Sequence, residues 1–145
     1  MVQGRPGPQR QMADWYMLYR APPGATSTYQ APIHDSALLG RADLTFGDVL
    51  MIRRALPRAD LIVDSPEGIH LVELKVRATL ADVGQVFQYL RYLQRDTSLA
   101  AKMDRPVHLV LCTLNDNANV RAAAEADGIE YIAIPSAELP ALPEA

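Results

Sequence analysis

The sequence predicts an α/β domain in which helices flank a mixed β-sheet. Two short apolar runs, Leu61–Val63 and Ile69–Val72, are joined by turn-forming residues at 65–68 and indicate a β-hairpin. After Lys75 the apolar residues recur at helical instead of alternating spacing, which is typical of an amphipathic helix. An apolar run at 107–113 then precedes an alanine-rich segment and a last apolar run. This alternation of strands and helices favours one layered α/β core.

The N-terminal third is harder to interpret. Large apolar side chains at 12–19 require burial, but their pattern does not distinguish a short helix from a strand. Residues 24–47 are polar and punctuated by Gly and Pro, and the apolar run Val49–Ile52 predicts a strand. We divide the chain into a flexible lead-in, an extension that packs on the core, the core and a C-terminal tail, at residues 1–11, 12–47, 48–134 and 135–145.

The segment after the hairpin predicts a helix with a defined start. Thr79 is placed as its N-cap, and Asp82 follows three positions later, as in a capping box. A stripe of apolar residues at helical spacing would face the core and comprises Val83, Phe87, Leu90 and Leu93.

Three further elements complete the predicted core. Residues 107–113 are almost wholly apolar and predict a central strand that is covered on both faces. The Ala-rich segment Asn117–Asp127 predicts a helix, and Gly128 is placed to cap its C-terminus. Residues 129–134 predict a last strand, which Pro135 ends.

Composition is that of an ordinary globular protein. The 145 residues form one domain by size, 49% of them are apolar, and the net charge is −3. Cys112 is the single cysteine, which excludes an internal disulfide and predicts a small buried side chain in a strand. No run approaches the length of a membrane span, and the N-terminus lacks the hydrophobic centre of a signal peptide. We therefore expect a cytoplasmic protein without a membrane partner.

Charged residues interrupt the predicted hairpin. Asp60 precedes the first apolar run, and Glu73 and Lys75 follow the second. Because side chains alternate along a strand, Glu73 and Lys75 leave one face of the sheet, His70 leaves the other, and the hairpin can bring Asp60 beside the first face. A solvated ion pair is the simpler explanation, but these charges continue strands that are otherwise apolar. Two carboxylates and an amine in this arrangement indicate a metal-dependent phosphodiesterase.

The helix that follows supplies further polar side chains. Gln85 and Tyr89 lie one turn apart and can hydrogen-bond a catalytic lysine or a phosphate. Arg91 and Arg95 form a neighbouring basic row, and Arg77 lies two positions after Lys75. Each arginine is either a contact to a nucleic-acid backbone or a solvated surface residue. The alternative is that these side chains are only the polar face of an amphipathic helix without a role in function. The charged strand directly before the helix favours a functional role for them.

Together these residues resemble the PD-(D/E)XK nuclease superfamily. The positions that carry the resemblance are Asp60, Glu73, Leu74, Lys75, Gln85 and Tyr89. The helix is similar to the RecB-like branch, and the spacing and chain length resemble Holliday-junction resolvases. The resemblance covers about residues 48–134 and implies a restriction-endonuclease-like core, with a mixed β-sheet flanked by helices.

The resemblance also implies an activity, namely a DNA endo- or exonuclease that hydrolyses phosphodiester bonds with a metal-activated water. It implies that Mg²⁺ or Mn²⁺ is held by Asp60, Glu73 and the backbone carbonyl of Leu74, and hard oxygen ligands suit these ions. The lysine of the same strand would help to activate the water. The Gln–Tyr pair would orient the lysine or the scissile phosphate.

Two features leave alternatives open. Many members of the superfamily carry an acidic residue upstream, often a glutamate, whereas the candidates here are Asp35, Asp43 and Asp48. The net charge is negative, although the partner would be a polyanion. The alternative function is a catalytically weak or inactive nuclease-fold subunit that binds DNA or serves in an assembly. A homodimer or larger complex is compatible with the apolar residues at 15–19.

Overall fold

A computed structural model describes residues 7–32, 45–48, 58–95 and 105–139 of the chain. The elements in chain order are α1 (Pro8–Tyr19), β1 (Thr26–Pro32), β2 (Arg58–Ser65), β3 (Gly68–Arg77), α4 (Leu80–Arg95), β4 (Val107–Asn115), α6 (Ala118–Ala126), β5 (Glu130–Ala133) and the short 3₁₀ helix η1 (Ser136–Glu138). The five strands form one sheet in the order β1-β2-β3-β4-β5. The first two pairings are antiparallel and the last two are parallel, so the sheet is mixed, as predicted.

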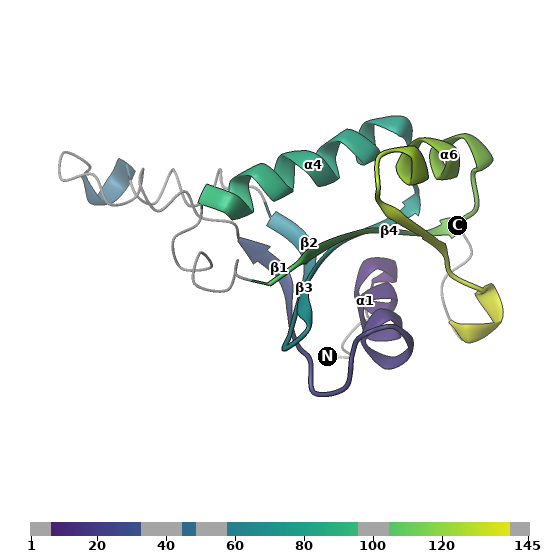
Figure 1. The fold of residues 1–145 in the computed structure, drawn as a ribbon, viewed down its shortest axis with the longest axis horizontal. Coiled ribbons are helices and arrows are strands. Elements are labelled where there is room, and N and C mark those ends of the chain that lie inside the picture. The colour runs from purple at the N-terminus through teal and green to yellow at the C-terminus, as the bar shows by residue number, and fades with distance from the viewer. Residues whose placement is uncertain (1–6, 33–44, 49–57, 96–104, 140–145) are drawn as a thin grey trace, which may run out of the picture.

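Helices cover both faces of this sheet (Figure 1). α4 and α6 lie on one face, which we call the α4 face, and α1 lies on the other, the α1 face. The core therefore has two apolar layers. Leu71 and Leu111 belong to the layer beneath α4, whereas Leu74, Val110 and Trp15 belong to the layer beneath α1.

The β2–β3 hairpin forms where the sequence predicts it. Its ladder runs from Ser65 opposite Gly68 to Leu61 opposite Val72. Gly68 is required by a close approach, since a Cβ atom at this position would lie 2.6 Å from the carbonyl oxygen of Pro106. The same carbonyl accepts a hydrogen bond from the backbone of Ile69. The turn thus joins the hairpin to the start of β4.

The helix caps predicted at Thr79 and Gly128 are present, and Asn117 forms a further cap that was not predicted. α4 begins at Leu80, directly after Thr79, and the Asp82 carboxylate accepts a hydrogen bond of 2.7 Å from the Thr79 backbone. Asn117 caps α6 by accepting hydrogen bonds from two backbone N–H groups of its first turn. Gly128 follows α6 with a φ of 76°, a conformation that favours glycine. Strands β4 and β5 differ from the predicted bounds by one or two residues.

The N-terminal region contributes more to the core than the sequence indicated. The segment 12–19 is helical, and α1 begins at Pro8, inside the stretch 1–11 predicted as a flexible lead-in. β1 is the edge strand of the main sheet, although the predicted core began only at residue 48. The strand predicted at Val49–Ile52 lies outside the described residues.

Other predictions about burial can also be compared with the structure. Cys112 is fully buried in β4, as expected for a small apolar side chain in a strand. Trp15 and Tyr16 pack against the sheet of the same chain, so these two side chains are not available as a dimer surface, whereas Leu18 and Tyr19 remain exposed. No helix in the described segments is both long and apolar enough to cross a membrane.

Candidate metal and catalytic site

The candidate site lies where β2 and β3 separate. The hairpin ladder stops at Leu61 opposite Val72. Continuing the same register places Asp60 opposite Glu73, although these two residues do not form a backbone ladder pair. Because opposite residues of an antiparallel pair place their side chains on one face, these two carboxylates face each other across the gap. Two like charges in this position repel each other. The pair of Asp60 and Glu73, which we call the carboxylate row, is therefore unfavourable unless protons or a cation reduce its charge.

Asp60 is buried, and both of its carboxylate oxygens accept hydrogen bonds. Oδ2 accepts from the backbone N–H of Leu74 at 2.9 Å, which replaces the backbone ladder at this point. Oδ1 accepts from the side-chain amide of Gln30, in β1, at 3.3 Å. Asp60 is therefore held in place from both neighbouring strands.

Glu73 is the most unusual group of the site. Its side chain is 3% exposed, and Oε2 is buried with no hydrogen-bond partner among the described residues. The pKa of Glu73 is raised from 4.5 to about 9, mainly by burial and also by the neighbouring Asp60 carboxyl, while Lys75 opposes the change. Glu73 therefore binds a proton at neutral pH unless another cation takes the place of that proton.

Lys75 supplies positive charge at the edge of this row. Its Nζ lies 3.6 Å from Glu73 Oε1 and 3.9 Å from Asp82 Oδ1, and its side chain is 30% exposed. Asp82 belongs to the first turn of α4, where its other oxygen caps the helix. The same cap that starts α4 therefore also orients the lysine, a role for Asp82 that the sequence did not reveal.

Gln85 and Tyr89 of α4 are brought together as predicted. The Gln85 amide donates a hydrogen bond of 2.9 Å to the Tyr89 hydroxyl, which keeps its own proton available for a second partner. Burial raises the pKa of Tyr89 to about 12, and the negative charges of Glu73, Asp60 and Asp82 contribute to the increase. The phenol is therefore a neutral donor within electrostatic reach of the carboxylate row.

The backbone carbonyl of Leu74 is a further oxygen of this part of β3, in the same residue as the N–H that donates to Asp60. It accepts a hydrogen bond of 3.0 Å from the side-chain amide of Gln9, in α1. Gln9 and Gln30 are two contacts of the site that sequence reasoning missed. Neither residue lies in a motif, and both reach the site across a long stretch of the chain, so local pattern carries no signal for them.

Other predicted site residues are less closely connected to the row. Arg77 and Arg91 are exposed, and the side chain of Arg95 lies outside the described residues. His70 lies on the α1 face, 2.5 Å from the hydroxyl of Tyr16, as its alternation with Glu73 predicted.

The structure describes one of the three upstream acidic candidates. Asp35 and Asp43 lie outside the described residues. Asp48 is exposed and accepts a hydrogen bond of 3.0 Å from the backbone of Thr45, so its carboxylate caps its own helical turn. This turn lies outside the layered core (Figure 1). Asp48 is therefore occupied by a local contact.

The donor set fits a hard divalent cation. Two buried carboxylates lie side by side, and one of their oxygens has no hydrogen-bond partner among the residues that the structure describes. Ions such as Mg²⁺ are commonly bound by one or two carboxylates together with several waters. Within the described part of the chain, no three His, Cys, Asp or Glu side chains are grouped to hold a metal. A cation here would therefore use Asp60 and Glu73, with carbonyl oxygens and water as its remaining ligands.

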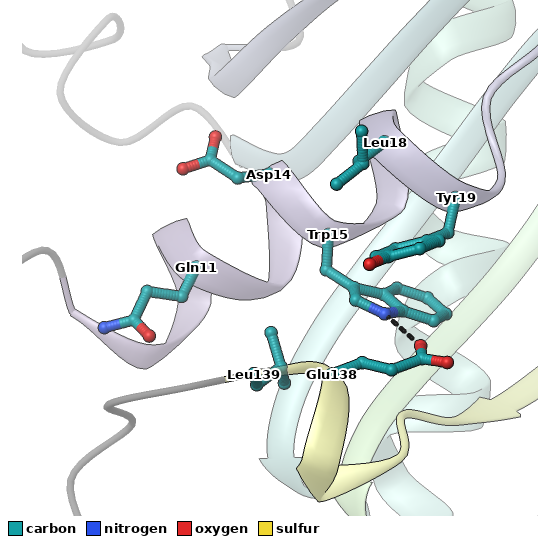
Figure 2. Close-up of a pocket in the computed structure, with 7 residues that line it drawn as sticks. All are labelled: Gln11, Asp14, Trp15, Leu18, Tyr19, Glu138 and Leu139. Atoms are coloured by element: carbon teal, nitrogen blue, oxygen red, sulfur yellow. Dashed lines mark hydrogen bonds between the residues drawn. The ribbon is translucent and has the colours of Figure 1, made fainter.

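A concave region elsewhere in the structure contains none of these residues (Figure 2). It is formed between α1 and η1 and is lined by Gln11, Asp14, Trp15, Leu18, Tyr19, Glu138 and Leu139. The Trp15 indole N–H donates a hydrogen bond of 2.7 Å to Glu138, which fastens η1 to α1. We interpret this region as a structural contact between the two ends of the described chain.

Comparison with known proteins supports the fold. No family model and no curated protein sequence matches the chain. Its structure is similar to that of a repair endonuclease from Pyrococcus abyssi, with a TM-score of 0.54 and 17% sequence identity. The similarity covers 92% of this chain and 49% of that one, so the chain spans about half the length of its structural neighbour. The predicted α/β fold, with a mixed sheet flanked by helices, is therefore confirmed, and this neighbour shares it.

Proposed function

We propose that this protein is a metal-dependent nuclease that hydrolyses phosphodiester bonds in DNA and belongs to the PD-(D/E)XK superfamily. One observation carries the proposal: Glu73 is buried beside Asp60, with an oxygen that has no hydrogen-bond partner in the described part of the chain. An ordinary core rarely retains such a group, because a buried carboxyl with an unsatisfied oxygen is unfavourable whether it is ionised or binds a proton. Polar groups that remain unsatisfied in this way are typical of sites that bind a ligand.

Asp60, Glu73 and the carbonyl of Leu74 are the groups that would hold Mg²⁺ or Mn²⁺. When bound, the ion would supply Lewis acidity and a lowered pKa for a coordinated water. The residues themselves prepare the site. Two donors fix Asp60, and burial keeps the row out of bulk water, where charges would be screened.

Lys75 and Tyr89 are the groups that would act on the substrate. The ammonium group of Lys75 is partly exposed beside Glu73 and can donate to a phosphate oxygen, where it offsets negative charge that develops during hydrolysis. Tyr89 is a neutral donor held by Gln85, and it can hydrogen-bond the same phosphate. Glu73 and Asp82 keep the lysine directed towards the row.

DNA is the proposed substrate on two grounds. The structural neighbour is a repair endonuclease, and the fold is shared. Arg77 is exposed two positions after Lys75 on β3, and Arg91 is exposed on α4. These arginines are proposed to contact the phosphate backbone, which would position DNA without reading its sequence.

The experiment is cleavage of labelled single-stranded, duplex and four-way-junction DNA in the presence of Mg²⁺ or Mn²⁺. We expect cleavage by the wild type and its loss in Glu73→Ala and Lys75→Ala proteins, with a reduction of at least about a hundredfold. Glu125→Ala is the matched control, because Glu125 is an exposed residue of α6 whose ion pair is with Arg121. This variant should cleave like the wild type.

Each outcome separates the proposal from its alternative. DNA binding without cleavage by the wild type would favour a nuclease-fold subunit that binds DNA or serves in an assembly. Cleavage that persists in the Glu73→Ala and Lys75→Ala proteins would mean that the site lies elsewhere.

A further inference from the structure

Gln30 has a backbone conformation that its residue type does not favour. Its φ is 54°, and among the described residues it is the non-glycine position at which φ is positive. The left-handed region is unfavourable for residues with a Cβ atom. Strain of this kind persists where the surroundings impose it, and it is concentrated at functional sites.

The strained residue lies in the same row as the carboxylates. β1 pairs with β2 on both sides of this point, at Tyr29 opposite Leu61 and Ala31 opposite Ala59, but the intervening pair of Gln30 with Asp60 is missing from the ladder. The Gln30 side chain instead donates to Asp60 Oδ1 at 3.3 Å. Its own carbonyl accepts a hydrogen bond from the Arg58 guanidinium at 3.3 Å.

A second glutamine makes a similar hydrogen bond to the site, from helix α1 to strand β3. Gln9, in α1, donates to the Leu74 carbonyl at 3.0 Å. Two side-chain amides from the N-terminal region therefore donate to neighbouring oxygens of the site, one to the Asp60 side chain in β2 and one to the Leu74 backbone in β3. Neither amide belongs to the Asp60, Glu73 and Lys75 set.

We propose that Gln30 and Gln9 are positioning residues of the metal site, which hold the Asp60 carboxylate and the Leu74 carbonyl in the orientation that a divalent cation requires. This inference rests on the proposed function. Residues that hydrogen-bond metal ligands orient them, and their loss typically weakens metal binding by about 10- to 100-fold. β1 and α1 would thus be part of the functional core rather than an accessory extension.

A Gln30→Gly substitution should affect the stability of the metal-free protein and its affinity for Mn²⁺ differently. Glycine adopts a positive φ without strain, so relief of the backbone offsets the lost hydrogen bond in the metal-free protein. We therefore expect the melting temperature without metal to change little, while the affinity for Mn²⁺ falls about tenfold or more. A merely structural role would lower both quantities together.

The experiment measures Mn²⁺ affinity by titration calorimetry and metal-free melting temperature for the full chain and its variants. Thr28→Gly is the matched control, because Thr28 is exposed on the same strand, pairs normally with Ile62 and does not contact Asp60. It should lower the melting temperature and leave Mn²⁺ affinity unchanged. Gln9→Met removes the amide but keeps the length of the side chain, and it should also weaken Mn²⁺ binding.

The outcomes distinguish this inference from the proposed function. If Glu73→Gln loses Mn²⁺ binding but Gln30→Gly binds like the wild type, the role of Gln30 is wrong and the metal site stands. A Gln9→Met protein with wild-type affinity would overturn the role of Gln9 in the same way. If the wild type binds no Mn²⁺, the proposed metal site fails and the positioning role fails with it.

Discussion

Two neighbouring residues of β3, Leu74 and Glu73, are both buried but lie on opposite faces of the sheet in different surroundings. Leu74 is 0% exposed and Glu73 is 3% exposed, so burial alone does not separate them. Leu74 faces the α1 layer and is surrounded by apolar side chains, including Val110 and Cys112. Glu73 faces the α4 layer, beside another carboxylate, and within the described segments one of its oxygens has no hydrogen-bond partner. Burial of Leu74 therefore stabilises the fold, whereas burial of the Glu73 carboxyl destabilises it.

The difference shows how a site can be recognised within a core. An apolar side chain that is fully buried has no unmet interactions, and its removal affects stability alone. A buried carboxylate without a donor is unfavourable in the empty protein, and a cation would remove this penalty. Substitutions on the two faces should therefore separate stability from metal binding and activity.

The largest effect on stability is expected on the α1 face. Leu74→Ala should lower the free energy of unfolding by about 2–5 kcal/mol, since it leaves a cavity in a fully packed layer. Urea denaturation followed by circular dichroism would measure the change. A value below about 1 kcal/mol would mean that α1 does not pack on the sheet as described.

A change of opposite sign is expected one residue earlier. Glu73→Gln should raise the metal-free stability at pH 8 by about 1–3 kcal/mol, because a neutral amide replaces a buried carboxyl that resists ionisation. In the folded wild type the pKa of Glu73 is raised to about 9, so the folded state binds more protons than the unfolded state above pH 4.5. The stability contributed by this proton is complete below pH 4.5 and is lost as the pH rises towards 9.

The measurement is a series of urea denaturations between pH 5 and pH 9 with a chelator present. The wild type should lose stability across this range relative to Glu73→Gln, and addition of Mn²⁺ should restore it only in the wild type. Parallel curves for the two proteins would contradict the raised pKa of Glu73.

A matched pair of tyrosines tests the two faces with one chemical change. Tyr16→Phe, on the α1 face, removes the contact with His70 and should lower the free energy of unfolding by about 0.5–1.5 kcal/mol, with cleavage unchanged. Tyr89→Phe, on the α4 face, should slow DNA cleavage by about tenfold or more. Equal effects of both variants on cleavage would indicate a general loss of structure rather than a role for Tyr89.

The smallest expected effect is the pH response of the α1 face. Burial lowers the pKa of His70 below 6.5, the charge of His108 lowers it further, and Glu130 and Glu67 oppose the shift. The unfolded state therefore binds more protons below pH 6.5, so stability should fall by less than about 1 kcal/mol as the pH decreases through this region. His70→Gln should reduce this dependence in thermal melts between pH 5 and pH 7. The sign is opposite to that of Glu73.

Much of the site could be predicted from a short stretch of sequence. The alternation of a strand places Glu73 and Lys75 on one face, and one helical turn brings Gln85 to Tyr89. Asp82 was recognised as part of a helix cap, but its second contact, with Lys75, depends on the angle at which α4 leaves β3. Local periodicity does not contain that angle.

Sequence alone determined the hairpin, the helix caps and the common face of the charged residues, because strand and helix geometry repeat over a few residues. Tertiary structure decided that 12–19 is a helix, since it lies on an apolar sheet face that the sequence did not locate. It also brought Gln9 to Leu74 and Gln30 to Asp60, across 65 and 30 positions of the chain. Such contacts depend on strand order and register, which long-range pairing sets and local pattern does not.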